Sequence, residues 1–163
     1  IINCGGQAIF DGRNSGAQGT GHWTTISVKG SRYIHLTGSG DVASFEYGIV
    51  AHDSVSHGVH FDEGCSDIEV DHVETHSNDY AGIVIRTYPR CGGRCGHVET
   101  NPSYQRLCSR GNFIQQNTRL HHNWVHDTPG EGFYVGTSHF QKDAYANVYD
   151  PSNQCAGETH AQP

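Results

Sequence analysis

The chain has 163 residues, a formal net charge of −7, 34% hydrophobic residues, 21 glycines and no methionine. Its length indicates a single domain, and the negative charge argues against nucleic acid as a partner. No apolar run reaches the roughly 18 residues of a membrane-spanning helix, so we expect a soluble, mature or trimmed chain without a membrane span.

Residues 1–21 are predicted to form a leading segment that caps the rest of the domain. Short apolar runs at Ile1-Ile2 and Ala8–Phe10 precede Asp11-Gly12, a turn signal, and a glycine-rich stretch follows over 14–21. Regular alternation of apolar and polar residues starts with Thr25–Val28 and predicts the first regular strand.

From residue 32 the sequence repeats itself. Ile34 and Ile68 are 34 positions apart, as are Ile49 and Ile83, and both members of the second pair follow a glycine. Self-similarity at a fixed period indicates a repeat architecture. A further copy begins at Leu120 and continues with a glycine-led run over 132–135.

Each repeat is predicted to hold three short strands, near 33–37, 48–52 and 58–62 in the first copy. Apolar runs spaced as in helices are absent, and turn residues break the chain every few positions. Because such strands bury their apolar residues only against the next copy, we predict an all-β parallel β-helix of about three to four coils. The strands at Ile34, Ile68 and Leu120 would form one parallel ladder. Those at Ile49, Ile83 and Phe133 would form another.

Three segments carry a family resemblance. SDIEVDHVETHSNDYAGIVIRT, RLHHNWVHDTPGEGFYVGTS and, near the start, NCGGQAIFDG resemble the secreted bacterial right-handed parallel β-helix repeat proteins of the pectate-lyase-like superfamily. The resemblance covers most of residues 1–140. It implies a right-handed β-helix over 1–163 and a secreted or cell-surface location.

The resemblance does not extend to the family's catalytic patterns. Polygalacturonase-like enzymes carry an Asp-Asp pair, a Gly-His-Gly and an Arg-Ile-Lys. This chain has no Asp-Asp, and its nearest counterparts are Ser56-His57-Gly58 and Ile85-Arg86-Thr87. The sequence therefore leaves open whether the chain is an enzyme at all. If it is one, the resemblance implies a polysaccharide lyase or a glycoside hydrolase.

Six cysteines indicate an oxidising compartment. Three of them lie in an insertion over 88–111, and a loop of this length is usually functional or covalently pinned. We expect disulfides among Cys91, Cys95, Cys108 and Cys155. The alternative is a structural zinc site from Cys91, Cys95, His97 and Cys108, whose spacing is not a common zinc pattern. Residues 141–163 lack the repeat and are predicted to be an irregular tail.

Strand alternation predicts a polar groove on the outer face. Ile49, Ile83 and Phe133 would point inward, and Val50, Val84 and Tyr134 outward. Stacking at about 4.8 Å would place His52 close to Arg86. The predicted catalytic residues are His52, Arg86 and Glu131, and the predicted substrate-binding residues are His60, Asp62 and Tyr134.

This groove suggests carbohydrate chemistry. A polysaccharide would lie across the stacked strands, with a carboxylate or another base for proton transfer. By the resemblance, Arg86 would neutralise a uronate or act in β-elimination, as an arginine does in pectate lyases. Polar residues on a solvated strand are also ordinary, so the alternative is a structural or adhesive extracellular module without catalysis.

No cofactor and no metal are predicted, with calcium as an alternative. The acidic residues from 62 to 71 are near one another in the sequence, but alternation is expected to divide them between two faces. The acidic residues in question are Asp62, Glu63, Asp67, Glu69 and Asp71.

The end of the repeat carries a prediction of its own. After Val135 the repeat stops, so Phe133, Val135 and Phe140 would face an uncovered edge. We therefore expect either that the chain is part of a longer β-helix or that another copy stacks there in a self-assembly.

Overall fold

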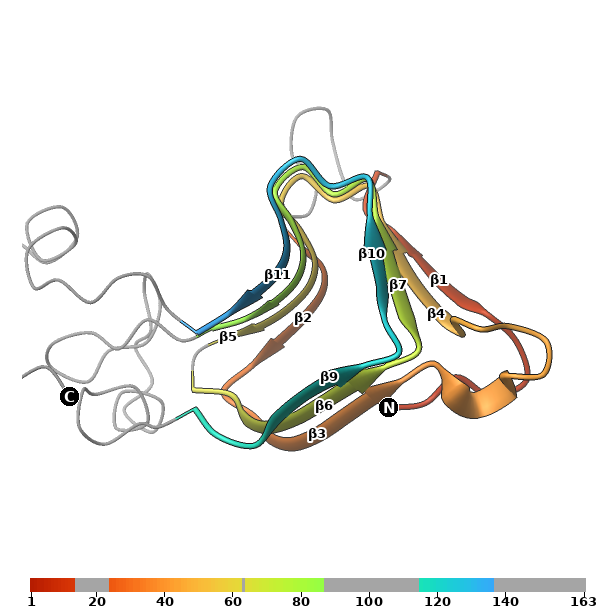
Figure 1. The fold of residues 1–163 in the computed structure, drawn as a ribbon, viewed down its shortest axis with the longest axis horizontal. Coiled ribbons are helices and arrows are strands. Elements are labelled where there is room, and N and C mark those ends of the chain that lie inside the picture. The colour runs from red at the N-terminus through yellow and green to blue at the C-terminus, as the bar shows by residue number, and fades with distance from the viewer. Residues whose placement is uncertain (14–23, 63, 87–114, 137–163) are drawn as a thin grey trace, which may run out of the picture.

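The structure is a computed structural model, and it describes residues 1–13, 24–62, 64–86 and 115–136 (Figure 1). The elements in chain order are β1 (Ala8–Asp11), β2 (Thr24–Lys29), β3 (Arg32–Thr37), the 3-10 helix η1 (Ser39–Asp41), β4 (Ile49–His52), β5 (His57–Asp62), β6 (Ser66–Asp71), β7 (Val73–His76), β8 (Ala81–Ile85), β9 (Thr118–His121), β10 (Trp124–His126) and β11 (Glu131–Val135).

The described strands form three sheets, and every pair is parallel. The orders are β1-β4-β7-β10, β11-β8-β5-β2 and β3-β6-β9. From β3 onward the chain passes through the three sheets in the same order in each turn, and Figure 1 shows them as the sides of a three-sided stack. The protein is therefore all-β, with an arrangement that is compatible with a β-helix.

One predicted ladder joins the right strands, and the other is right for Ile83 and Phe133 but wrong for Ile49. Ile34 pairs with Ile68 as expected, although Leu120 pairs with Val70 two residues further on. Ile49, in contrast, does not stack on Ile83. It pairs with Val73, and Ile83 lies between Val59 and Phe133.

Bends of unequal length explain this error. Residues 38–48, including η1, connect β3 to β4, whereas His72 alone connects β6 to β7. Because of the longer bend, Ile49 follows Ile34 by as many residues as Ile83 follows Ile68. Ile49 nevertheless belongs to β4 and Ile83 to β8, which lie in different sheets. Two similar runs were therefore matched across different sheets.

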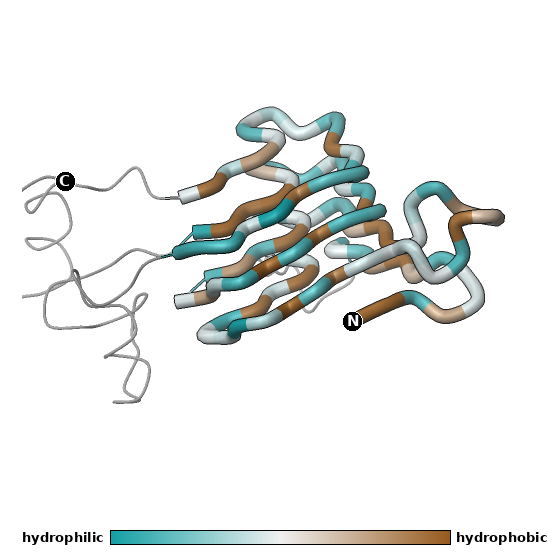
Figure 2. The backbone as a smooth tube through the Cα atoms, turned by 60° about the horizontal axis from the view of Figure 1, so that its bottom comes forward, coloured by the Kyte–Doolittle hydropathy of each residue, from teal (hydrophilic) through white to brown (hydrophobic). Residues whose placement is uncertain are grey.

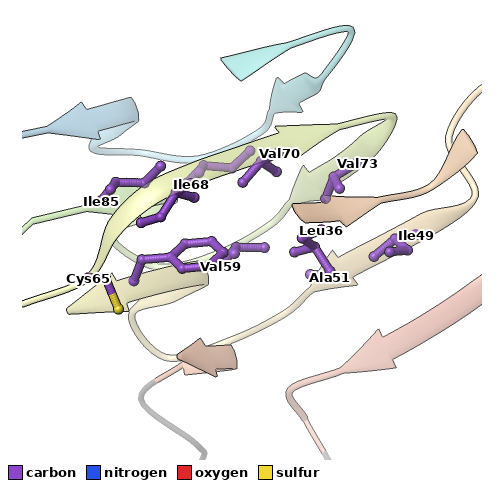
Figure 3. Close-up of a cluster of buried hydrophobic side chains, with 11 residues drawn as sticks. Leu36, Ile49, Ala51, Val59, Cys65, Ile68, Val70, Val73 and Ile85 are labelled. Carbon is purple, nitrogen blue, oxygen red and sulfur yellow. The ribbon is translucent and has the colours of Figure 1, made fainter. Parts of the chain in front are cut away.

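The core lies between the three sheets, where alternate side chains of each strand point inward. Figure 3 shows members of this cluster from β3, β4, β5, β6, β7 and β8. The predicted inward residues Ile49 and Ile83 are both buried. The buried members are Leu36, Ile49, Ala51, Val59, Phe61, Cys65, Ile68, Val70, Val73, Ile83 and Ile85. Figure 2 shows the same alternation as hydrophobic and hydrophilic residues in turn along the strands.

The outward prediction needs correction on the β2–β5–β8–β11 sheet. Val84 and His60, expected on an exposed face, are both buried, and so is Val50 on the neighbouring sheet. Alternation therefore sets the direction of a side chain but not its exposure.

Bends recur at matching positions in successive turns. Asp67 and Asn117 have positive φ angles of 56° and 52°, and Asp53 and Asp127 have φ angles of 55° and 50°. Asn and Asp tolerate this left-handed conformation better than most residues, which suits them to corners between strands.

The cysteine prediction falls largely outside the described residues. Cys91, Cys95, Cys108 and Cys155 all lie there, as does His97 of the alternative zinc site. Cys4 is exposed with a free thiol, and Cys65 is a core residue whose Sγ accepts a hydrogen bond from Ser31 N over 3.4 Å. Within the described ranges, no helix is long and apolar enough to cross a membrane.

Candidate functional site

The outer face of β3, β6 and β9 carries a grid of polar side chains. One column consists of His35, Glu69 and Arg119, and a second, two residues further along each strand, consists of Thr37, Asp71 and His121. These residues alternate with inward apolar residues, so the same pattern that builds the core places them outside. We call these six residues the β3–β6–β9 face.

Asp71 is the most buried carboxylate of this face, at 3% exposure. Thr37 Oγ1 donates to its Oδ1 over 2.5 Å, His72 Nδ1 lies 2.6 Å from the same oxygen, and His35 Nε2 contacts Oδ2. Burial alone would raise the pKa of Asp71, but the hydrogen bonds outweigh it and lower the pKa to about 2. Asp71 is therefore ionised at neutral pH.

Glu69 is held by two neighbours from β9. His121 Nε2 lies 2.8 Å from Oε1, and Arg119 Nη1 lies 3.3 Å from Oε2. The hydrogen bond from His121 is the main cause that lowers the pKa of Glu69 below its usual value. Both carboxylates of the face are thus ionised, and neither can donate a proton at neutral pH.

A hollow of about 300 Å³ adjoins this face. Tyr33, at its edge, is 82% exposed, and Asn117 Nδ2 donates to Asp67 Oδ1 over 2.6 Å. The hollow spans strands β3, β6 and β9, and its lining combines an aromatic ring with charged and amide groups. The lining residues are Tyr33, Ile34, His35, Asp67, Ile68, Glu69, Asn117 and Arg119.

Four of the predicted site residues lie together on a different sheet. His60, Asp62 and Tyr134 belong to β5 and β11, and Arg86 directly follows β8 between them. The Arg86 guanidinium carbon lies 5.5 Å from the centre of the Tyr134 ring, and His60 Nε2 lies 3.4 Å from Asp62 Oδ2.

His60 is poorly placed to meet a substrate, since it is only 8% exposed. Burial, followed by the charges of His57 and Arg86, lowers the pKa of His60 to about 3, and burial lowers that of His57 to about 4. Both imidazoles are neutral at physiological pH.

The remaining two predicted catalytic residues are separated from this group in different ways. His52 lies in β4 on the adjacent sheet, where it stacks on His76, so the expectation that it approaches Arg86 is wrong. Glu131 starts β11 opposite Ala81 and is exposed. The structure thus divides the predicted set between two sheets.

The sequence interpretation missed the β3–β6–β9 face. It expected alternation to separate the acidic residues of 62–71, yet Glu69 and Asp71 are two positions apart and share one face. A signal was present, because His35, Glu69 and Arg119 occupy equivalent positions of the strand repeat.

Two groups of potential metal ligands occur among the described residues. The ligand atoms of His35, Glu69 and Asp71 lie within 4.8 Å of one another, and so do those of Asp11, His52 and Asp53. In the second group the Arg13 guanidinium contacts both carboxylates, at 2.8 Å from Asp11 and 3.4 Å from Asp53. One positive charge thus already offsets part of the negative charge of that group.

No protein-family model, curated protein or solved structure matches the chain. The resemblance to the pectate-lyase-like superfamily therefore stays a prediction. The fold and the site define an all-β protein with three sheets of parallel strands and a polar hollow across one of these sheets.

Proposed function

We propose that the protein is a secreted or cell-surface polysaccharide-binding protein that holds its glycan in the hollow beside the β3–β6–β9 face. The observation that carries this proposal is the hollow itself, which crosses three stacked strands next to an exposed aromatic ring. A polymer that runs across the strands would meet lining residues from β3, from β6 and from β9 and the residue before it.

The lining chemistry fits a sugar chain. Tyr33 offers a wide apolar ring with a polar tip, on which a sugar ring can stack. Asp67, Glu69, Asn117 and Arg119 offer hydrogen-bond acceptors and donors around it, and their mutual contacts hold them in place to meet hydroxyl groups.

The chemistry of the hollow favours binding over hydrolysis. A glycoside hydrolase needs one protonated carboxyl group as general acid, usually with a raised pKa. The pKa of Glu69, which lines the hollow, is lowered, and so is that of Asp71 on the adjoining β3–β6–β9 face. The predicted catalytic residues His52 and Arg86 also lie on different sheets, which gives no support to a joint role in lyase or hydrolase chemistry.

A right-handed parallel β-helix of the pectate-lyase-like type is part of this proposal. Its support is the repeated order in which the chain visits three parallel sheets. Connections between parallel strands of one sheet are right-handed in about 98% of cases, so the right-handed form is the expected one.

A binding assay on a panel of neutral and acidic polysaccharides tests the function. Tyr33→Ala is expected to weaken binding at least about ten-fold by loss of the stacking ring. Tyr80→Ala, which changes another partly exposed tyrosine next to His57, is the matched control and should leave binding unchanged. Equal binding by the wild type and Tyr33→Ala would contradict the proposal. Absorbance from unsaturated uronates in the same mixtures would reveal lyase activity.

A second candidate function is a structural or adhesive module that assembles through its ends. Exposed apolar side chains on the first and last described strands favour it. They are Ile9 and Phe10 in β1, Trp124 in β10, and Phe133 and Val135 in β11.

A further inference from the structure

The β3–β6–β9 face brings together metal-binding side chains from three strands. His35 comes from β3, Glu69 and Asp71 from β6, and His121 from β9. The ligand atoms of His35, Glu69 and Asp71 already lie within 4.8 Å of one another, and His121 Nε2 lies 2.8 Å from Glu69 Oε1. In a tetrahedral zinc site, ligands at about 2.0–2.2 Å from the metal are about 3.4 Å apart, so small side-chain rotations suffice to surround an ion.

The donor set has the composition that suits a divalent transition metal. It combines two imidazoles with two carboxylates. Arg119 Nη1 lies 3.3 Å from Glu69 Oε2 and offsets part of the negative charge, whereas Oε1 of Glu69 faces His121. In the structure His35 contacts Asp71 and His121 contacts Glu69. A metal ion would be coordinated by these imidazole nitrogens and carboxylate oxygens.

Neighbouring groups orient these ligands. Thr37 and His72 hold Oδ1 of Asp71, which leaves Oδ2 directed at His35. The Nδ1 atom of His121 lies 2.8 Å from Nδ1 of His122, which leaves its Nε2 directed at Glu69. Outer partners of this kind fix the orientation of metal ligands in proteins. The adjacent hollow, which His35 and Glu69 also line, gives an ion a path from solvent.

We propose that His35, Glu69, Asp71 and His121 form a binding site for a divalent transition-metal ion, with zinc as the probe. The second ligand group, Asp11, His52 and Asp53, is the less suitable one because the Arg13 guanidinium contacts both of its carboxylates, whereas Arg119 contacts only Glu69 of the proposed site. The site shares His35 and Glu69 with the lining of the hollow, but zinc binding can be measured without a sugar, so its failure is distinguishable from a failure of polysaccharide binding.

Calorimetric titration of the chelator-treated chain with Zn²⁺ tests the proposal. Two substitutions remove ligands without opening the core, His35→Gln and Glu69→Gln, because both side chains reach the surface. Each is expected to weaken the zinc site at least about ten-fold. His52→Gln, a substitution in the competing group, should leave the affinity unchanged. Circular dichroism of each variant verifies that it is folded.

Cobalt provides a second readout that separates this site from the cysteines. Co²⁺ bound to nitrogen and oxygen ligands lacks the thiolate-to-metal charge-transfer band, so the wild type should show d–d bands without it, and His35→Gln should lose them. The proposal is overturned if the wild type binds no zinc, if His52→Gln weakens binding as much as His35→Gln, or if the cobalt complex shows thiolate ligation.

Discussion

The imidazole rings of His52 and His76 lie parallel on neighbouring strands, with centroids 4.9 Å apart and an angle of 1° between their planes. His126 continues the stack at 5.1 Å from His76. Equivalent residues of parallel strands repeat at about 4.8 Å, so the sheet itself sets this spacing. The three rings form a histidine ladder in which a positive charge on one ring disfavours a charge on the next.

The first prediction is that members of the histidine ladder titrate at different pH. Burial, and then the neighbouring His52, lower the pKa of His76. Burial alone would also lower the pKa of His126, but hydrogen bonds to Asp127 and Glu74 outweigh it and raise that pKa. In an NMR titration of the imidazole signals, His126 should therefore gain its proton at a higher pH than His76.

Asp127→Asn provides the matched change for this titration. Asp127 is exposed, so its replacement should leave the fold intact while it removes the negative charge next to His126. The pKa of His126 should fall. If His76 and His126 titrate together in the wild type, or if Asp127→Asn leaves His126 unchanged, this account of the ladder is wrong.

A second prediction concerns acid stability. His57 and His60 are buried, with pKa values lowered from 6.5 to about 4 and about 3. Below pH 6.5 the unfolded chain therefore binds protons that the folded chain does not, and the stability that is fully present above pH 6.5 is lost as the pH falls towards 4 and 3. Carboxylates with a lowered pKa change the free energy of unfolding only below about pH 4. The loss of stability between about pH 6.5 and pH 4 is therefore assigned to the two histidines.

Urea unfolding between about pH 7.5 and pH 4.5 measures this loss, which we expect to reach about 3 kcal/mol or more. His60→Gln should lower the stability at neutral pH but flatten its pH dependence. A wild-type free energy of unfolding that stays constant across this range would rule the mechanism out.

A third prediction compares two glycines at equivalent positions of β8 and β11. A Cβ atom on Gly82 would lie 2.2 Å from Val125 Cγ1 and 2.8 Å from the backbone oxygen of Gly132, whereas one on Gly132 meets only Val125 Cγ1 at 3.6 Å. Gly82→Ala should therefore destabilise the fold by about 1–3 kcal/mol through overpacking, and Gly132→Ala should be nearly neutral. Thermal unfolding of both variants decides the matter. Equal melting temperatures would show that the turns of the chain do not pack as closely as described.

A fourth prediction concerns the last described strands. β9, β10 and β11 each pair on one side only among the described strands, and Phe133 and Val135 are 48% and 53% exposed. Unpaired parallel edges with apolar side chains favour association. Solution scattering should show that the chain associates as its concentration rises and that Phe133→Lys reduces this association.

Tyr33→Lys is the control for the association, because it changes an even more exposed aromatic residue on a side of the stack. It should associate like the wild type. A compact monomer at all concentrations, with the β11 edge covered by the chain's own tail, would contradict the prediction. Phe140, which the sequence analysis placed at this edge, lies outside the described residues.

The strand pattern could be predicted from the sequence because it depends on neighbours along the chain. Alternation around Ile68 and Val70 predicts a strand with one apolar face, and the recurrence of that pattern predicts stacked parallel copies. Burial of apolar side chains drives both features, and an apolar residue is visible in the sequence itself. Sequence alone therefore determined the all-β class, the parallel stacking and most inward positions.

Only the tertiary structure decided which run continues which sheet and which polar groups meet. Ile49 continues to Val73 and not to Ile83, because the bends between sheets differ in length and similar runs can be matched across them. His35, Glu69 and His121 come from three different turns of the chain, and their contact depends on the register between β3, β6 and β9. A shift of one residue in that register would turn each of these side chains to the opposite face, which is why the site exists only once the strands are stacked.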